Sequence, residues 1–247
     1  MAAAAGCLLT HWPVSDCSSL IDNYPDSTPF FVLLQIMRSY WVKTPGWLPR
    51  LFPKELIWKM ESEQSVFLTF DDGPHPEATP FVLDQLKQHQ AQASFFCIGK
   101  NVTEHAAIYK RILEEGHTVG NHTQNHMNGW KQENHTYLNN ILQASRHIES
   151  RNYRPPYGRI RMSQVRRLSK GKKPWRIYMW DILSGDFDQQ LTPEECLANV
   201  LNHLEPGSIV VFHDSAKAFP RLQFVLPEVL RYCKTKSWQP EALPSYQ

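Results

Sequence analysis

The chain has 247 residues, of which 42% are hydrophobic and 20% charged, and its formal net charge is +2. This composition is typical of a globular protein with a packed core and excludes a disordered or collagen-like chain. We interpret the Lys and Arg residues as scattered along the sequence, which gives no electrostatic footprint for nucleic acid. No nucleic-acid partner is therefore expected.

The cysteines and apolar segments bear on the cellular compartment of the protein. Five cysteines are an odd number without C-x-x-C spacing, so neither a disulfide framework nor a thiolate zinc site is indicated. The longest apolar stretch near the start, residues 30–37, is far shorter than the roughly 20 residues that span a bilayer. Residues 2–9 are Ala-rich and apolar but lack the basic n-region of a signal peptide. We expect no membrane span and a cytoplasmic location, while the oligomeric state stays unknown.

Composition changes along the chain suggest three parts. Residues 1–36 lack sustained periodicity and are interpreted as a flexible N-terminal extension. Residues 37–63 contain alternating aromatic and basic residues and are predicted to pack on the main domain. That domain is expected to cover residues 64–247.

From residue 64 onward, β-rich runs alternate with helical patterns, which is typical of βα units and a parallel sheet. Strands are expected at 66–70, 93–97, 117–120, 153–154, 176–180, 209–212 and near Trp238. Eight full units of a TIM barrel take roughly 250 residues, more than this region offers. The pattern therefore predicts an α/β fold, a distorted and incomplete, seven-stranded, TIM-like (β/α) barrel. A doubly wound open sheet is the alternative.

The first predicted strand ends in two adjacent carboxylates, Asp71 and Asp72, within VFLTFDDGPHP. Ionised neighbours of this kind repel each other, so a cation or strong hydrogen-bond donors should lie nearby. Asp before Gly-Pro is also favourable turn chemistry. The pair alone does not define a site.

A pair of histidines, His122 and His126, follows the third predicted strand in VGNHTQNHMNGW. Four residues apart, they share one face if the chain turns helical after the strand. Two such imidazoles can bind one metal ion, and a catalytic zinc site has three protein ligands plus an open position for water. An Asp of the first segment would complete the set. The pair by itself is weak evidence.

Three further polar clusters complete the pattern. YRPPYGRI places Arg154 before two prolines and a glycine, in a rigid loop able to present the Tyr157 N–H. The other clusters follow apolar strands and supply Asp181, Asp186, Asp188, His213 and Asp214. All five clusters follow the carboxyl ends of predicted parallel strands, which is where barrel enzymes assemble their active sites.

Five motifs occur in a fixed order: TFDDGP at 69–74, HTQNH at 122–126, RPPYG at 154–158, Asp186 with Phe187, and VFHD at 211–214. With these motifs, residues 66–232 resemble the polysaccharide deacetylase family, which is carbohydrate esterase family 4 with the NodB homology domain. The resemblance implies a metal-dependent hydrolase that removes the N-acetyl group of an amino sugar. The expected partner is an acetylated carbohydrate, either a chitooligosaccharide or a peptidoglycan-like glycan.

The resemblance also implies a role for each motif residue. Asp72, His122 and His126 would bind a divalent cation, namely Zn²⁺ with Co²⁺ or Ni²⁺ as substitutes. The expected catalytic residues are Asp71 as general base, His213 as general acid, Arg154 and Asp186 as their supports, and Tyr157 through its backbone N–H.

Two positions depart from the family pattern: Phe187 replaces the common Trp, and Val211 replaces the common Leu. Together with Pro156 and Tyr157 they are expected to line the substrate pocket. The departures leave acyl and sugar preference open. An O-acetyl esterase of the xylan type or a small-amide hydrolase is the alternative on the same site. A catalytically silent sugar-binding protein would lack a ligand or base, and none is missing.

Overall fold

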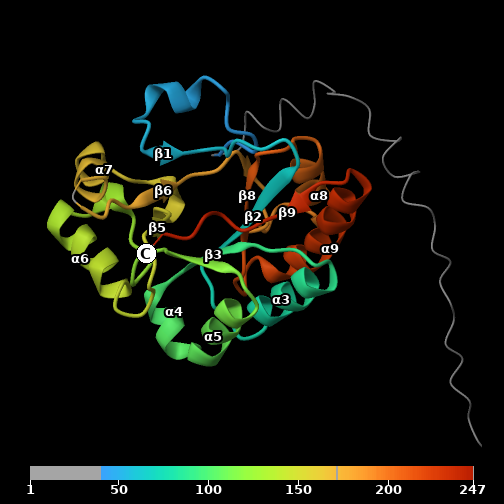
Figure 1. Ribbon diagram of the computed structural model, residues 1–247, viewed down its shortest axis with the longest axis horizontal. Helices are drawn as coiled ribbons and strands as arrows, with labels where there is room; N and C mark the ends of the chain where they lie inside the picture. Colours follow the sequence, from blue (N-terminus) through green and yellow to red (C-terminus); the bar gives the residue numbers. More distant parts are fainter. Residues whose placement is uncertain (1–39, 171, 247) are drawn as a thin grey trace, which may run out of the picture. The chain divides into compact units, whose positions relative to one another are not determined.

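The computed structural model describes residues 40–170 and 172–246, and a parallel sheet forms their centre (Figure 1). The predicted flexible extension, residues 1–36, lies outside the described residues. Nine strands of the described residues pair in the order β1 (Leu56–Ile57), β6 (Arg176–Tyr178), β5 (Asn152–Tyr153), β4 (Thr118–Asn121), β3 (Ser94–Cys97), β2 (Ser65–Asp71), β8 (Ile209–His213) and β7 (Ile182–Leu183), with β9 (Gln239–Pro240) beside β2.

The sheet is open, since β1 and β7 end its strand order and, among the described residues, do not pair with each other. Residues from the predicted packing segment 37–63 lie against it: Lys43 forms an antiparallel bridge with Ile182, and Lys59 with Ser208. The prediction of an incomplete α/β barrel is confirmed. The predicted number of strands, seven, was too low. Strands β1 and β7 were missed because each has only two residues and shows no periodicity.

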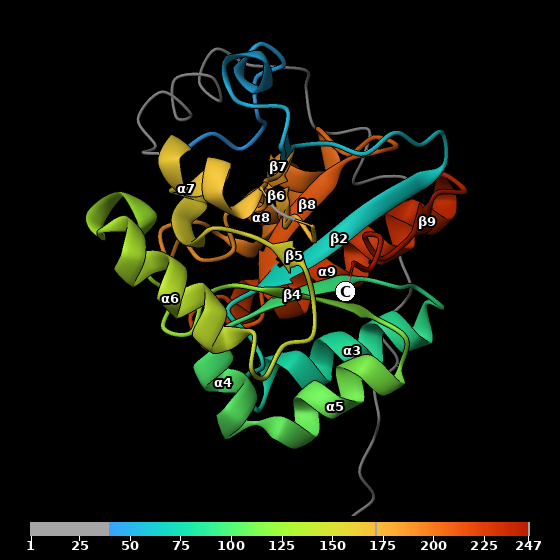
Figure 2. The same ribbon diagram turned by 60° about the vertical axis from the view of Figure 1, so that its left-hand side comes forward.

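Helices cover the outside of the sheet (Figures 1 and 2). The α-helices are α3 (Ala78–Gln88), α4 (Gly99–Glu104), α5 (Ala106–Glu114), α6 (Asn134–Ala144), α7 (Met162–Leu168), α8 (Pro193–Leu201) and α9 (Phe219–Thr235), and the 3-10 helices are η1 (Leu48–Leu51), η2 (Gly129–Lys131) and η3 (Pro156–Gly158). Local sequence explains some boundaries. Thr192 caps α8, and its hydroxyl and the Glu195 carboxylate form a reciprocal capping box. No helix in the described part of the chain has the length and apolarity to cross a bilayer.

Strand β2 is buried along both faces, as expected for a parallel strand covered on each side. On the helix side, Phe70 stacks between Phe95 and Phe212, with ring centroids 5.1 and 5.7 Å away. Side chains alternate along a strand, so Phe67 and Asp71 share the opposite face. That face carries Asp71 to the carboxyl end of the sheet.

Candidate active site

The turn after β2 presents Asp71 and Asp72 at the carboxyl edge of the sheet. Asp71 is buried, while Asp72 has a left-handed backbone with φ of 81°. The Gly73 N–H donates to Asp214 Oδ1 at 3.0 Å, and a Cβ on Gly73 would lie 2.0 Å from Asp214 Oδ2. Only glycine permits this approach. Gly73 and Asp214 thus hold the turn in place.

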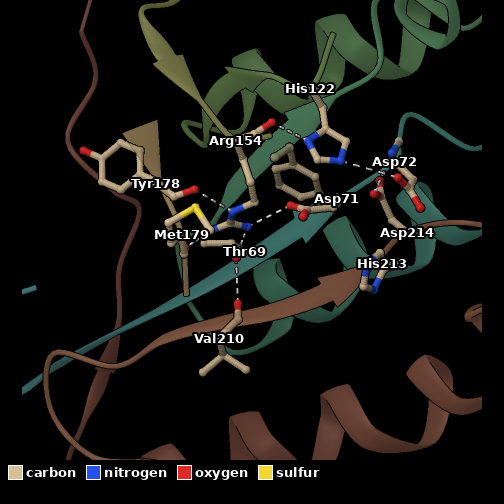
Figure 3. Close-up of polar contacts among 12 residues, drawn as sticks. Thr69, Asp71, Asp72, His122, Arg154, Tyr178, Met179, Val210, His213 and Asp214 are labelled. Carbon is tan, nitrogen blue, oxygen red and sulfur yellow. Dashed lines mark hydrogen bonds and ion pairs between the residues drawn. The ribbon is translucent and has the colours of Figure 1, made fainter. Parts of the chain in front are cut away.

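Arg154, which follows β5, fixes Asp71 from within the sheet (Figure 3). Its side chain is fully buried, and Nη1 donates to Asp71 Oδ1 at 2.8 Å and to Thr69 Oγ1 at 2.7 Å. Nε and Nη2 donate to the carbonyl oxygens of Tyr178 and Met179. A buried guanidinium requires such complete pairing. The Asp71 carboxylate is therefore held in one orientation.

The two histidines come from a loop after β4 rather than from a helix. The helical turn predicted to align them is not formed by residues 122–128. Thr123 and His126 instead adopt left-handed conformations, with φ of 66° and 53°, and the Met127 N–H donates to Thr123 Oγ1 at 3.1 Å. This tight loop returns His126 toward His122, and their ring centroids are 5.0 Å apart.

Asp72, His122 and His126 converge on one point. Asp72 Oδ1 lies 3.2 Å from His126 Nε2 and 3.7 Å from His122 Nε2. One ligand atom from each residue falls within 4.8 Å of the others, and this is the only such group of His, Cys, Asp and Glu in the described part of the chain. Asp72 Oδ1 is buried without a hydrogen-bond partner. An orphaned carboxylate oxygen beside two imidazole nitrogens fits a divalent cation.

The surroundings of His122 keep its Nε2 available as a ligand. Nδ1 lies 2.8 Å from the Arg154 carbonyl oxygen, which can only accept, so Nδ1 carries the proton. Burial, reinforced by the charge of His126, holds the pKa of His122 well below its ordinary value. A neutral imidazole with a fixed tautomer suits metal binding.

His213, the last residue of β8, lies beside Asp71 in the neighbouring strand. Asp186 is fully buried and accepts twice from His213: from the backbone N–H at 2.7 Å and from Nδ1 at 2.8 Å. Burial lowers the pKa of His213, but the charge and hydrogen bond of Asp186 outweigh it and raise this pKa to about 9. His213 is therefore protonated at neutral pH.

Tyr157 lies at the rim of the cluster, in η3 after the buried Pro156. Its φ is 59°, its side chain is 61% exposed, and its ring centroid lies 4.5 Å from that of His126. The loop packs closely on the sheet side, since a Cβ on Gly158 would lie 2.6 Å from the Trp180 ring. The rigid loop predicted from the Pro-Pro-Tyr-Gly sequence thus brings Tyr157 to the His126 side of the site.

The two predicted pocket residues lie around His213. The Phe187 ring is half-buried and meets the His213 ring edge-on, with centroids 5.1 Å apart. Val211 is two positions before His213 on β8, so it shares that face one layer deeper and is buried. Phe187 borders the site, and Val211 lies beneath it.

Two supporting residues escaped prediction. Asn101 of α4 donates to the Asp72 carbonyl oxygen at 2.7 Å, and the buried Arg221 of α9 donates from Nε to the Asp186 carbonyl oxygen at 2.6 Å. An arginine within an otherwise apolar stretch of α9 was the only local signal. Asp181, from the fourth predicted cluster, instead binds Lys43 at 2.7 Å and anchors the N-terminal segment.

The chain is similar to proteins of one family. A family model described as Polysaccharide deacetylase matches residues 59–171. The peptidoglycan-N-acetylglucosamine deacetylase of Bacillus cereus is 33% identical over 191 residues, which cover 74% of this chain and 68% of the relative. The chitooligosaccharide deacetylase of Azorhizobium caulinodans is 32% identical over 162 residues, covering 62% and 75%.

The chain also has a fold similar to that of solved structures. A peptidoglycan N-acetylglucosamine deacetylase in complex with 4-naphthalen-1-yl-N-oxidanyl-benzamide has a TM-score of 0.73 and 31% identity, covering 81% of this chain and 95% of that one. A carbohydrate esterase family 4 pseudoenzyme from Bacillus anthracis shares the fold, with a TM-score of 0.65 at 20% identity. The chain belongs to the polysaccharide deacetylase family, as its motifs indicated.

Proposed function

We propose that the protein is a metal-dependent hydrolase that removes the N-acetyl group from an amino sugar of an oligosaccharide or polysaccharide. One observation carries the proposal: Asp72, His122 and His126 converge beside Asp71 and His213 at the carboxyl edge of the sheet. The relatives named as deacetylases of peptidoglycan and chitooligosaccharide support the substrate class. A silent sugar-binding protein would not need this complete set.

Asp72, through a carboxylate oxygen, and His122 and His126, through Nε2, would hold the cation. This family is in general metal-dependent. Zn²⁺ accepts these ligands, and we propose it as the native ion, with Co²⁺ or Ni²⁺ able to replace it. When bound, such an ion polarises a carbonyl oxygen and lowers the pKa of a water from about 15.7 toward about 7.

Asp71 is proposed as the general base that takes a proton from the attacking water. The carboxylate is buried, and the guanidinium of Arg154 holds its Oδ1 at 2.8 Å, so its position is fixed before substrate arrives. Preorganisation of this kind lowers the barrier, because no rearrangement is needed during the reaction. Arg154 acts as a positioning residue.

His213 is proposed as the general acid. An amine is a poor leaving group until it is protonated, and a pKa of about 9 keeps a proton on His213 at neutral pH. Asp186 fixes the ring through Nδ1, which directs the opposite nitrogen, Nε2, away from that carboxylate. This arrangement favours an amide substrate, since amide hydrolysis depends most on a proton donor.

Tyr157 is proposed to stabilise the oxyanion of the tetrahedral intermediate through its backbone N–H. Its left-handed conformation beside His126 supports this role, since such backbone is held only where surroundings enforce it. Phe187, Val211 and Pro156 are proposed to shape the pocket for the acetyl methyl group and the sugar.

Acetate release from three glycans, together with ring opening of a cyclic amide, tests the reaction. The zinc-loaded protein should release acetate from N-acetylglucosamine oligomers or peptidoglycan strands, and less from O-acetylated xylan. It should open the ring of a cyclic amide more slowly than it deacetylates the amino sugars. Asp71→Asn should abolish turnover yet keep about one zinc per chain, as measured by metal analysis. Absence of acetate from every sugar substrate would refute the deacetylase. Release from acetylxylan alone would identify an esterase.

A further inference from the structure

Basic residues are concentrated in one segment next to the active site. Residues 151–176 contain ten Lys and Arg and no Asp or Glu, whereas the rest of the chain has 16 Lys and Arg against 24 Asp and Glu. The interpretation of these residues as scattered was therefore wrong. A net charge of +2 conceals a strongly basic segment in an otherwise acidic chain.

Most of these cations are exposed to solvent. Arg154 is buried and belongs to the site, but those at 159, 166, 167, 170, 172 and 173 are exposed. None of these six, nor Lys131 or Arg161, forms an ion pair with another described residue. We call Lys131, Arg159, Arg161, Arg166 and Arg167 the basic surface.

The basic surface adjoins the active site through two loops. Arg159 follows Tyr157 by two positions, and its guanidinium lies over the Trp130 ring, 5.3 Å from the centroid. Arg161 Nη2 donates to the Trp130 carbonyl oxygen at 2.8 Å. Trp130 itself follows His126 by four positions. Arg159 and Arg161 therefore lie in or contact the two loops that carry Tyr157 and His126, whose rings are in contact at the site.

Helix α7 extends the basic surface beyond these two loops. It begins at Met162, directly after Arg161, so Arg166 lies about 7.5 Å from Arg161 along the helix axis. This spacing is below the Debye length of about 8 Å at physiological salt, so the charges act together. Figures 1 and 2 show α7 next to α6, at the side of the sheet where β5 and β6 lie. A polymer that leaves the site over this side meets several exposed cations.

We propose that the basic surface binds anionic groups of the glycan whose acetyl group enters the active site. The substrate is then an acidic polysaccharide, with carboxylate, sulfate or phosphate groups near the acetylated sugar. Guanidinium groups match these anions through paired hydrogen bonds. Trp130, 57% exposed, adds an aromatic surface between the cations and the site. The inference rests on the proposed function, because it places the polymer by the acetyl group.

Two probes that differ only in charge test the inference. One is a six-unit N-acetylglucosamine oligomer, and the other is the same oligomer with some C6 hydroxyls oxidised to carboxylates. At low salt we expect kcat/KM to be about tenfold higher for the carboxylated oligomer. At about 1 M salt, where the Debye length is about 3 Å, this preference should disappear.

A matched pair of variants locates the effect. The triple variant Arg159→Gln, Arg166→Gln and Arg167→Gln removes three charges from the basic surface. Lys87→Gln, Lys234→Gln and Lys236→Gln removes three exposed charges where α3 and α9 end, near the start of β2 rather than Asp71. The ratio of the two kcat/KM values should fall about tenfold in the first variant and stay within about twofold of wild type in the second.

The outcomes separate this inference from the proposed function. If the wild type deacetylates the neutral oligomer but shows no preference for the carboxylated one, only the inference fails. If neither oligomer yields acetate, the proposed function fails. An equal fall of the ratio in both triple variants would overturn the inference, since charge alone would matter and not its place. Tighter binding of a 12-nucleotide RNA or of phosphatidylserine vesicles than of the carboxylated oligomer, lost in the first variant, would also overturn it.

Discussion

His122 and His213 lie in the same site, yet their surroundings move their pKa values in opposite directions. Burial, reinforced by His126, lowers the pKa of His122 well below its ordinary value. Burial also acts on His213, but the charge and hydrogen bond of Asp186 outweigh it and raise the pKa to about 9. At pH 7 one imidazole is neutral and the other carries a proton.

The partner of Nδ1 explains the difference. His122 Nδ1 meets the neutral carbonyl oxygen of Arg154, whereas His213 Nδ1 meets the carboxylate of Asp186, each at 2.8 Å. Both acceptors fix the tautomer, but a neutral carbonyl stabilises the protonated ring less than a charged carboxylate does, and at His122 burial outweighs it. One residue type therefore supplies a proposed metal ligand and a proposed acid within a single site, as expected when environments push pKa values apart.

Replacing either histidine by alanine should have the largest effects, and these effects should differ between the two residues. His122→Ala removes a proposed ligand, so both the bound zinc and all measurable acetate release should be lost. His213→Ala removes the proposed acid alone, so kcat should fall about 10²–10⁴-fold while zinc stays bound. Metal analysis and acetate release on the same samples measure both. Loss of zinc from His213→Ala would assign His213 to the metal site instead.

Asp186→Asn tests why the two pKa values differ, because it removes the charge of the carboxylate while keeping the shape of the side chain. Without the carboxylate, the pKa of His213 should fall from about 9 toward its ordinary 6.5. Activity requires the protonated ring and is lost as pH rises through this pKa, so the alkaline limit of kcat should move to lower pH. At pH 8 we expect a loss of about tenfold or more.

Profiles of kcat from pH 6 to 10, with the same metal in both proteins, measure this shift, because the influence of the ion then cancels. A variant that is slower at every pH, with an unchanged alkaline limit, would show that Asp186 only positions the ring. Binding of zinc should be equal in both proteins, since Asp186 is not a proposed ligand.

The polar clusters were predictable because each signal is local. Apolar runs predicted the long strands, and Asp71, Asp186 and His213 follow such runs, at the edge where the carboxyl ends of parallel strands meet. The identity of the carboxylate beside the histidines came from the family resemblance, since spacing did not separate Asp71 from Asp72. Recognition of the motifs supplied what periodicity lacked.

Features that depend on tertiary contacts were not predictable. Left-handed backbone at Thr123 and His126 replaces the expected helical turn, and nothing in HTQNH signals it. Arg221 reaches Asp186 from a helix 35 positions later in the chain. The two-residue strand β7 exists because its neighbours pair with it, not because of its own pattern.

Asp214 extends the comparison to a buried carboxylate whose partners are an amide and a hydroxyl. Burial raises its pKa to about 8; the hydrogen bond from Thr79 opposes this rise, and the charge of Asp72 adds to it. The ordinary value is 3.8, so between pH 4 and 8 the folded protein retains a proton that the unfolded chain releases. The free energy of unfolding therefore declines as pH rises through this window.

Asp214→Asn removes this decline, because the amide is neutral at every pH and can still accept from the Gly73 N–H. Relative to wild type, the variant should gain on the order of 5 kcal/mol in the free energy of unfolding between pH 4 and pH 8. Urea unfolding of both proteins, with a chelator present so that metal binding does not contribute, measures the difference. A difference that stays constant with pH would mean that Asp214 is charged in the folded protein, and that the Thr79 hydroxyl and the Gly73 amide suffice to keep it so.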